Sequence, residues 1–301
     1  MFMKKLSDQE LIDELRTRLE ERQLSLNELT ILSNQLLEVN KKLTESEAMK
    51  SHFLANIRNE IVNPFASILG ISKHLAGIKD DWEKVSVFAS MIHAEAFDLN
   101  FQFKNIFAAA EIESGNSTPE YAKVNIISLL NEITEEFNFL ARSKKIGLIV
   151  DNRLDPLNSV WYFVTDPGKL ELIISNLLRN ALEFSYENND IVLLIEYDEA
   201  NDMFIVSVKD QGVGIEKNEQ ERIFDRFYKH SKNINSSNKG HGLGLSIVRH
   251  YVDLLGGTID VDSELGHGSK FTIKLPPGNI SSISGFSETS NEMFFDQSEK
   301  F

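Results

Sequence analysis

Two asparagine side chains are spaced so that they face the same way. Asn176 and Asn180 stand four residues apart in a segment predicted to be helical, at about 167–184, so both amides lie on one helix face. An amide oxygen is a neutral ligand that a hard cation such as Mg²⁺ accepts when phosphates supply the remaining charge. Asparagines on a helix are usually just solvated, so this pair is informative only together with other motifs.

A carboxylate and two glycines follow a predicted strand at 203–209. The carboxylate of Asp210 can accept a hydrogen bond from an exocyclic amine, while Gly212 and Gly214 let a flat base lie against the backbone. By itself this Asp-x-Gly-x-Gly pattern is also a common turn. It indicates a base-binding site only in combination with a site for phosphates.

Three further glycines precede a helix predicted at 246–255. Gly240, Gly242 and Gly244 bring the chain to the start of that helix, where free N–H groups and the positive end of the helix dipole favour phosphates. A Rossmann-type interpretation fails, because no strand–helix–strand unit with a downstream acidic ribose ligand surrounds these glycines. Leu243 lies within the same motif and is included in the predicted site.

A polar segment separates the second and third motifs. Residues 231–239 are rich in serine and asparagine, and Phe224 and Phe227 precede them. This composition predicts a mobile lid that is anchored by the two aromatic side chains.

The elements that position these motifs read as a mixed α/β region at 120–277. Phe204, Val206 and Val208 alternate with less buried residue types, as expected for a half-covered antiparallel strand. Helices on one face of a mixed sheet predict an α/β sandwich. The predicted helices are 126–143 and 167–184, and the predicted strands are 147–152, 191–197, 203–209, 258–262 and 270–275.

The N-terminal part is predicted to be helical, which makes the whole chain α+β. Residues 1–49 contain apolar residues at alternating three- and four-residue spacings, although the repeat is imperfect. This pattern favours a dimeric coiled coil with a stutter or short break near Arg22 and Ser25. The alternative is one amphipathic helix packed on its own domain. Residues 50–117 read as a helical hairpin with a kink at Pro64, and a hairpin forms a four-helix bundle only with a second chain. The apolar seam residues are Leu11, Leu15, Leu19, Leu26, Leu29, Leu32, Leu36, Val39 and Leu43.

Composition restricts the partners of the chain. Forty-six acidic against 31 basic residues give a net charge of −15, which argues against binding to nucleic acid or an anionic membrane. The absence of cysteine excludes thiolate catalysis and suits a reducing compartment. No apolar stretch is long enough for a membrane span, so we expect a cytoplasmic protein with protein partners.

Residues 278–301 are expected to form a flexible tail. Within it, Phe294, Phe295 and Phe301 could form a short docking motif.

Taken in this order and spacing, the three motifs resemble the ATP-binding domain shared by histidine kinases, gyrase-type topoisomerases and Hsp90-type chaperones. With the hairpin, the chain resembles a sensor histidine kinase over about 50–275, and 242–275 is similar to the family almost throughout. The resemblance implies ATP and Mg²⁺ as cofactors, with Asn180 as the metal ligand and Asn176 beside it. It further implies that Asp210 recognises adenine, with the following residues shaping the base site, the lid and the phosphate site: Gly212, Gly214, Phe224, Phe227, Gly240, Gly242, Leu243 and Gly244.

The chain departs from the family at three positions. Glu183 stands where the family usually has lysine, and we expect its negative charge to weaken triphosphate binding. His241 replaces a small hydroxylated residue, which bears on lid packing. Asn59 stands where the family has its phospho-accepting histidine. An amide nitrogen has its lone pair delocalised into the carbonyl and is a very poor nucleophile, so autophosphorylation at this position should be lost.

Other parts of the acceptor box are retained. Glu60 matches the family's acid/base partner, and Asn63 matches the position that orients water when such proteins dephosphorylate a response regulator. The alternative is that both are solvated or capping groups at a proline kink. His52, His74 and His93 lack the surrounding box and are expected to be surface or packing residues.

Three functions remain open from the sequence. The first is an ATP-binding homodimer that acts in two-component signalling as a regulator, as a response-regulator phosphatase, or with a partner histidine kinase. The second is an active kinase that phosphorylates a partner chain in trans. The third is a non-enzymatic interaction scaffold. The glycine-lined turns and Asn180 favour the first two, because a chain without nucleotide has no evident need for such turns.

Overall fold

The computed structural model describes residues 8–78, 81–154, 160–228, 242–279 and 285–287, without the side chains of parts of the first helix, including those of 48–60. It contains two units, Met1–Asn56 and Ile57–Phe301, each of which is considered by itself.

The first unit is helical throughout its described residues. Helix α1 (Asp8–Ala76) starts in this unit and has no interruption near 22–25, so the short break considered there is absent. The apolar side chains of this part of α1 are largely exposed, as expected for a coiled-coil seam that packs against a second helix. The coiled-coil dimer itself stays a prediction. The exposed seam residues include Leu19, Leu26, Leu29, Leu32, Leu36 and Val39.

The second unit begins with the helical hairpin. The helix continues through Pro64 to the end of α1, and helix α2 (Trp82–Ser114) follows after a turn. Asp81 caps the start of α2 by accepting a hydrogen bond from the Lys84 N–H, and Gly115 ends it in the left-handed conformation with φ 70°. The second helix of the predicted hairpin is therefore present.

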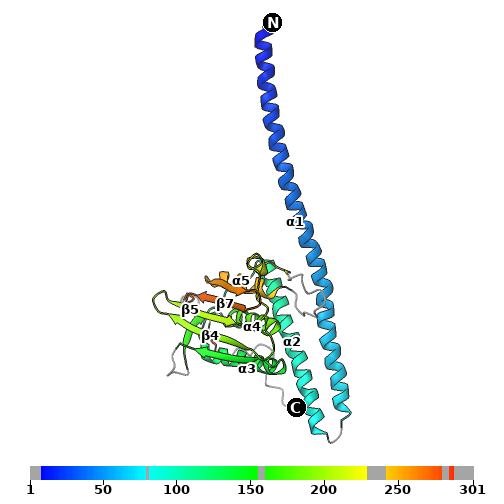
Figure 1. Ribbon diagram of the computed structural model, residues 1–301, viewed down its shortest axis with the longest axis vertical. Helices are drawn as coiled ribbons and strands as arrows, with labels where there is room; N and C mark the ends of the chain where they lie inside the picture. Colours follow the sequence, from blue (N-terminus) through cyan, green and yellow to red (C-terminus); the bar gives the residue numbers. More distant parts are fainter. Residues whose placement is uncertain (1–7, 79–80, 155–159, 229–241, 280–284, 288–301) are drawn as a thin grey trace. The chain divides into compact units, whose positions relative to one another are not determined.

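A five-stranded sheet forms the centre of the remaining chain (Figure 1). The strand order is β2-β4-β5-β7-β6, with β2 parallel to β4 and all other neighbours antiparallel. Each predicted strand is present. The strands are β2 (Gly147–Asn152), β4 (Asp190–Asp198), β5 (Met203–Lys209), β6 (Thr258–Glu264) and β7 (Gly268–Leu275).

Three helices cover one face of this sheet (Figure 1): α3 (Ile126–Ser143), α4 (Pro167–Phe184) and α5 (Gly244–Leu254). The strand residues that face the helices are almost fully buried, as Phe204, Val206 and Val208 show with exposures of 0–1%. Alternate residues face the other way, which is the pattern of a sheet covered on one side. The predicted α/β sandwich is confirmed.

A second, three-stranded sheet was not predicted. Its order is β3-β1-β8, formed by β1 (Ala122–Asn125), β3 (Tyr162–Thr165) and β8 (Gly285–Ser287). Strands of three or four residues are too short to show a period in the sequence. Because β8 lies in the segment 278–301, the expectation of an unstructured tail is corrected for these three residues. The three C-terminal phenylalanines lie outside the described residues.

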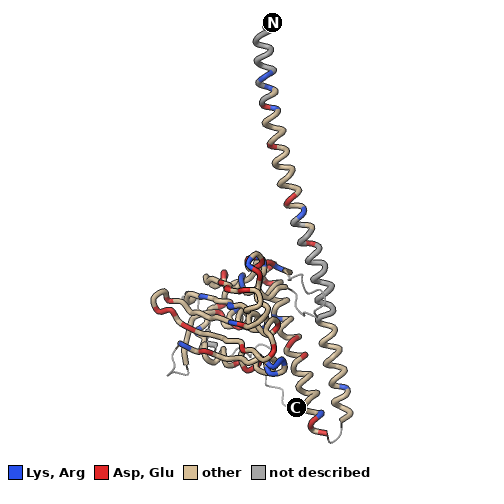
Figure 2. The backbone as a smooth tube through the Cα atoms, in the orientation of Figure 1, with Lys and Arg blue, Asp and Glu red and all other residues tan. Residues whose placement is uncertain are grey.

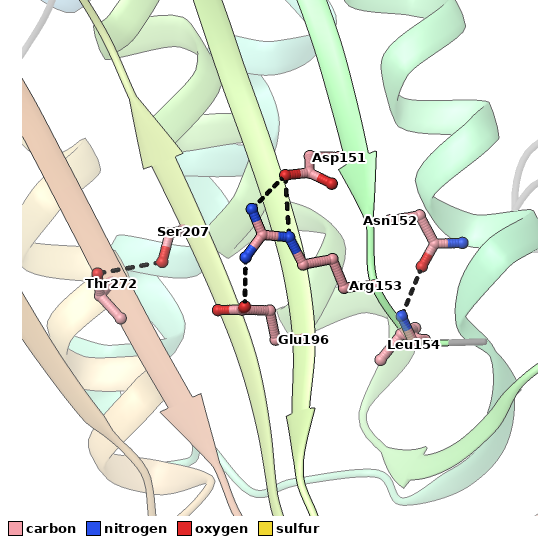
Figure 3. Close-up of polar contacts among 7 residues, drawn as sticks. All are labelled: Asp151, Asn152, Arg153, Leu154, Glu196, Ser207 and Thr272. Carbon is pink, nitrogen blue, oxygen red and sulfur yellow. Dashed lines mark hydrogen bonds and ion pairs between the residues drawn. The ribbon is translucent and has the colours of Figure 1, made fainter. Parts of the chain in front are cut away.

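The sheet face opposite the helices carries polar pairs between neighbouring strands. Arg153, which follows β2, binds Glu196 of β4 at 3.0 Å and is also held by Asp151 of its own strand at 2.7 Å (Figure 3). The hydroxyls of Ser207 on β5 and Thr272 on β7 lie 3.1 Å apart. Such cross-strand pairs help to hold the register of the sheet.

Charged residues of both signs are interspersed along the described part of the chain (Figure 2). Within those residues, no helix combines the length and apolar character needed to cross a membrane. The expected lack of nucleic-acid binding stays a prediction.

Candidate functional site

Helix α4 is capped at its start and carries the two asparagines. The Asp166 carboxylate caps its start by accepting from the Lys169 N–H at 2.9 Å, and Pro167 occupies the first turn. Asn176 is buried and donates from Nδ2 to the Leu172 carbonyl at 2.8 Å. Asn180, one turn later, is half-exposed, and its side chain has no hydrogen-bond partner among the described residues. Its amide is therefore available to a ligand.

The start of helix α5 lies directly against Asn176. A Cβ atom added to Gly244 would come within 2.5 Å of the Asn176 Oδ1 atom. Leu243 is buried immediately before the helix and provides no side-chain cap. The first turn of α5 thus offers uncapped N–H groups close to the α4 asparagines. The helix begins two residues earlier than predicted, at the glycine itself.

The loop after β5 packs on the C-terminal end of α4. A Cβ atom on Gly212 would lie 2.0 Å from the Phe184 carbonyl oxygen, and the Val213 N–H donates to the same oxygen at 3.2 Å. The Asp210 Oδ1 atom accepts from the Gly212 N–H at 2.9 Å. The loop is therefore folded back on its own carboxylate and fixed to α4.

Asp210 is an unusual buried carboxylate. It is 5% exposed, and it forms no ion pair with any described residue. Burial raises the pKa of Asp210, while hydrogen bonds from the backbone of Gly212 and Ser269 act in the opposite direction. Burying a carboxylate without a cation costs stability, and such groups are concentrated at functional sites.

Helix α4 arranges the three motifs in a line. Gly244 contacts it at Asn176 and Gly212 contacts it at Phe184, eight residues further on. At 1.5 Å per residue these contacts are ~12 Å apart along the helix axis, and Asn180 lies midway between them. A carboxylate for a base, an amide for a metal and a helix start for phosphates therefore follow one another along a single helix.

The aromatic residues at the start of the predicted lid are anchored. Phe224 is 9% exposed, packs edge-on against Phe271, and has the Arg249 guanidinium 5.2 Å from its ring centre. The Phe227 N–H donates to the Gly242 carbonyl at 2.9 Å, which joins the two sides of the segment 229–241. That segment lies outside the described residues, and so do Gly240 and His241.

The glycines have a structural role that the sequence did not indicate. Gly212 and Gly214 would each place a Cβ atom 2.0 Å from a carbonyl oxygen, of Phe184 and Glu264 respectively. Gly214 and Gly242 also have φ +68°. Close backbone packing therefore requires glycine at these positions with or without a ligand. The expectation that only a ligand would explain the glycine-lined turns was wrong.

The acidic residue at the expected lysine position is neutralised by a neighbour. The Glu183 Oε2 atom lies 3.2 Å from the Lys144 Nζ atom, which also donates to the Leu182 carbonyl at 3.0 Å. Lys144 follows helix α3 and belongs to no recognisable motif. Because the ion pair offsets the negative charge, the expected repulsion of a triphosphate is reduced.

Helix α4 also contacts helix α2 of the hairpin, and the sequence did not predict this contact. Arg179, between the two asparagines, forms an ion pair with Asp98 of α2, and its guanidinium lies 5.7 Å from the Phe101 ring centre. Lys104 of α2 binds Glu171 of α4 at 2.6 Å. No sequence spacing connects these residues, so only the fold reveals the contact.

The acceptor box lies within helix α1. Asn59 and Glu60 are helical, but their side chains lie outside the description, whereas Asn63 is exposed. His74 stacks on Phe88 and His93 packs edge-on against Phe139, as expected of packing residues. The side chain of His52 is outside the described part of the chain.

Comparison with known proteins identifies the class of the domain. The family described as "Histidine kinase-, DNA gyrase B-, and HSP90-like ATPase" matches residues 165–279, which contain all three motifs. The fold and the site therefore define an ATPase domain of the histidine kinase, gyrase and Hsp90 type.

Similar full-length proteins extend the match to the hairpin. The hybrid signal transduction histidine kinase D of Dictyostelium discoideum is 29% identical over 85% of this chain and 16% of its own length. The circadian input-output histidine kinase CikA of Synechococcus elongatus is 29% identical over 81% and 33%. A crystal structure of full-length ShkA with AMPPNP is 26% identical, with a TM-score of 0.52, over 75% of this chain and 46% of that one.

Residues 165–279 therefore belong to this ATPase family, and the chain as a whole is similar to sensor histidine kinases over most of its length. It spans about a sixth to a third of the two curated relatives named above.

Proposed function

We propose that this chain binds ATP with Mg²⁺ along helix α4 and acts in cytoplasmic two-component signalling without phosphorylating itself at position 59. The buried, unpaired carboxylate of Asp210 carries the nucleotide part of this proposal. A carboxylate that lacks a cation partner can accept a hydrogen bond from the exocyclic amine of adenine. Its position near the C-terminal end of α4, with the α5 start about two turns away at Asn176, fits an extended nucleotide.

The metal would be held by Asn180 together with the phosphates of the nucleotide. Among the described residues, no group of three or more His, Asp or Glu side chains could hold a metal ion. A single amide ligand suits Mg²⁺, which usually retains waters and binds through substrate phosphates. Bound there, Mg²⁺ would supply charge neutralisation for the triphosphate. Asn176 supports the site because its side chain packs against Gly244 at the start of α5.

The acceptor position separates this chain from a self-phosphorylating kinase. Asn59 offers no nitrogen lone pair that could attack the γ-phosphate of ATP. Glu60 and Asn63 keep the residue types needed to orient a water molecule near a phosphorylated aspartate, and Asn63 is exposed. These observations favour a regulator or response-regulator phosphatase.

The partners are a second copy of this chain and a receiver domain or partner histidine kinase. The exposed leucines of the first unit would be covered in a coiled coil. The hairpin would complete a four-helix bundle with the same second copy.

One experiment separates the proposed function from its alternatives. The purified chain is incubated with radiolabelled ATP, alone and with a histidine kinase fragment that carries an intact acceptor, and separately with a candidate receiver that already carries radiolabelled phosphate. The proposal predicts ATP binding, no label on the chain and loss of label from the receiver.

The other outcomes identify the other functions. Label on the partner fragment would indicate an active kinase in trans, which the paired Glu183 makes feasible. No nucleotide binding and no effect on either partner would indicate a scaffold and contradict the proposal.

A further inference from the structure

The loop that carries Asp210 is held at both of its ends by two serines. The Ile215 N–H donates to the Ser263 Oγ atom at 2.8 Å, and the Asp210 N–H donates to the Ser269 carbonyl at 2.8 Å. Ser263 on β6 and Ser269 on β7 are opposite each other in register, with their Oγ atoms 2.9 Å apart. We call residues 210–215 the base loop. Its two ends are thus fixed by one pair of neighbouring residues.

The hydrogen-bonding capacity of the Ser263 hydroxyl is fully used. A hydroxyl has one proton and two lone pairs. Ser263 donates its proton to the Gly268 carbonyl at 2.9 Å and accepts from the Ile215 N–H. The contact with Ser269 must then be one that Ser263 accepts, with Ser269 as the donor. Removing this hydroxyl would leave three groups without their partner.

Backbone contacts bring the base loop and the β6–β7 turn into direct apposition. A Cβ atom on Gly214 would lie 2.0 Å from the Glu264 carbonyl oxygen, and one on Gly268 would lie 2.2 Å from the Asp210 carbonyl oxygen. The Gly266 N–H also donates to the Val213 carbonyl at 2.7 Å. The loop therefore takes its position from the turn, so a shift of the turn would move the loop.

A second side chain supports the same junction. The Gln220 amide donates from Nε2 to the Ile215 carbonyl at 3.2 Å and to the Ser263 carbonyl at 2.8 Å. Ile215 and Ser263 are thus linked twice, once through the serine hydroxyl and once through this amide. The junction is built to keep the end of the base loop in one place.

We propose that Ser263 is a positioning residue for base recognition, which holds the base loop so that the Asp210 carboxylate meets the exocyclic amine of adenine. This inference rests on the proposed ATP binding. Ser263 acts through the loop and not by contact with the nucleotide. The sequence gives no sign of this role, because Ser263 lies 53 residues from Asp210 and outside the three motifs.

The same sheet offers a matched control. Ser207 is buried on β5, and its hydroxyl lies 3.1 Å from that of Thr272 on the neighbouring strand β7 (Figure 3). It is therefore another serine whose hydroxyl bridges two strands. Unlike Ser263, it has no hydrogen bond to the base loop among the described contacts. Ser207→Ala measures the effect of losing a buried inter-strand hydroxyl alone.

The test compares two nucleotides on the full chain with Mg²⁺ by titration calorimetry. One is ATP, and the other is purine riboside triphosphate, which lacks the exocyclic amine. Ser263→Ala should weaken ATP binding by about tenfold, the size of one well-formed hydrogen bond to a charged group, and leave the second nucleotide nearly unchanged. Ser263→Thr, which keeps the hydroxyl, should restore ATP affinity, and Ser207→Ala should bind both nucleotides as the unmodified chain does.

Two results would overturn the role of Ser263 alone: unchanged ATP affinity in Ser263→Ala, or an equal loss of both nucleotides. If Ser263→Ala does not fold, Ser263→Thr decides instead, because a folded threonine variant with a reduced preference for ATP over the second nucleotide would contradict the positioning role. Failure of the unmodified chain to bind either nucleotide would refute the proposed function, and the role of Ser263 with it.

Discussion

Asparagines of helices α4 and α1 differ in what their amides can do. In α4, Asn180 is half-exposed between the base loop and the start of α5, where an amide oxygen is a suitable metal ligand. In α1, Asn59 stands where a nucleophile is needed, and an amide cannot provide one. On the proposed function, the same type of side chain serves metal binding in α4 and prevents phosphate acceptance in α1.

If the proposed function holds, nucleotide binding and phosphate acceptance are separable in this fold. The base loop packs through Gly212 and Gly214 on backbone atoms, and the α5 start packs through Gly244 on the Asn176 side chain, so change in this region carries a folding cost. The acceptor position has no comparable constraint in the sequence. We therefore expect the nucleotide site to persist where the acceptor is replaced.

The nucleotide half of the contrast depends most on Asn180. Asn180→Ala should reduce Mg²⁺-dependent ATP affinity by ~100-fold or more, because the metal loses its protein ligand. Titration calorimetry with and without Mg²⁺ measures this loss. Asn131→Ala, at an exposed site on α3, should bind ATP normally. Equal affinities for Asn180→Ala and the unmodified chain would show that the metal is held elsewhere.

Glycine substitutions test whether close packing maintains the site. Gly214 and Gly266 both have positive φ, of 68° and 83°, but only Gly214 faces a carbonyl oxygen at 2.0 Å from the added Cβ. Gly214→Ala should therefore cost ~3 kcal/mol or more of unfolding free energy, with loss of ATP binding. Gly266→Ala should cost only ~1 kcal/mol. Denaturant unfolding compares the two, and similar costs would contradict the packing argument.

The raised pKa of Asp210 gives the site a pH signature. Because burial raises the folded-state pKa above the unfolded value, the folded state holds more protons between the two values, so stability falls as pH rises through that window. ATP binding needs the carboxylate, so affinity rises over the same window. Titrations and thermal melts across mildly acidic pH should show these opposite slopes.

Asp210→Asn is the control for this pH dependence. It has no carboxyl to titrate, so both slopes should be much reduced. If the ATP affinity of the unmodified chain does not change with pH in that window, the carboxylate is not the base-recognition group.

The smallest effect is expected at the ion pair beside α4. Lys144→Gln should weaken ATP binding by ~3-fold, because it uncovers the charge of Glu183, and partly exposed pairs contribute up to ~1 kcal/mol. Added salt should reduce the difference. Lys145→Gln, which breaks the more exposed pair with Glu187, should have no effect on affinity. Tighter binding by Lys144→Gln would contradict the compensating role.

The periodicity of apolar residues in the sequence predicted much of the fold. The sequence predicted few of the contacts within the site. Helices α3 and α4 and strands β2 and β5 have the predicted bounds, because their apolar residues repeat over enough turns or alternations. The three-stranded sheet was missed, since its strands are too short for a repeat. Its β8 strand also comes from a polar tail whose composition suggested no structure.

The site was predicted as three motifs, and the contacts between them were not. Ser263, Lys144 and the Arg179–Asp98 ion pair each act across long sequence separations. Residue types alone gave no reason to connect them. The glycines were assigned to a ligand, whereas the structure shows that the backbone itself requires them at Gly212 and Gly214.

The central claim is that the nucleotide site is intact and only the acceptor is missing. The most direct test is incorporation of radiolabelled phosphate from ATP into the unmodified chain and into Asn59→His, each without a partner. We expect no acid-labile, alkali-stable label on the unmodified chain and clear label on the hairpin of Asn59→His. Label on the unmodified hairpin, or a histidine variant that binds ATP and stays unlabelled, would contradict the account.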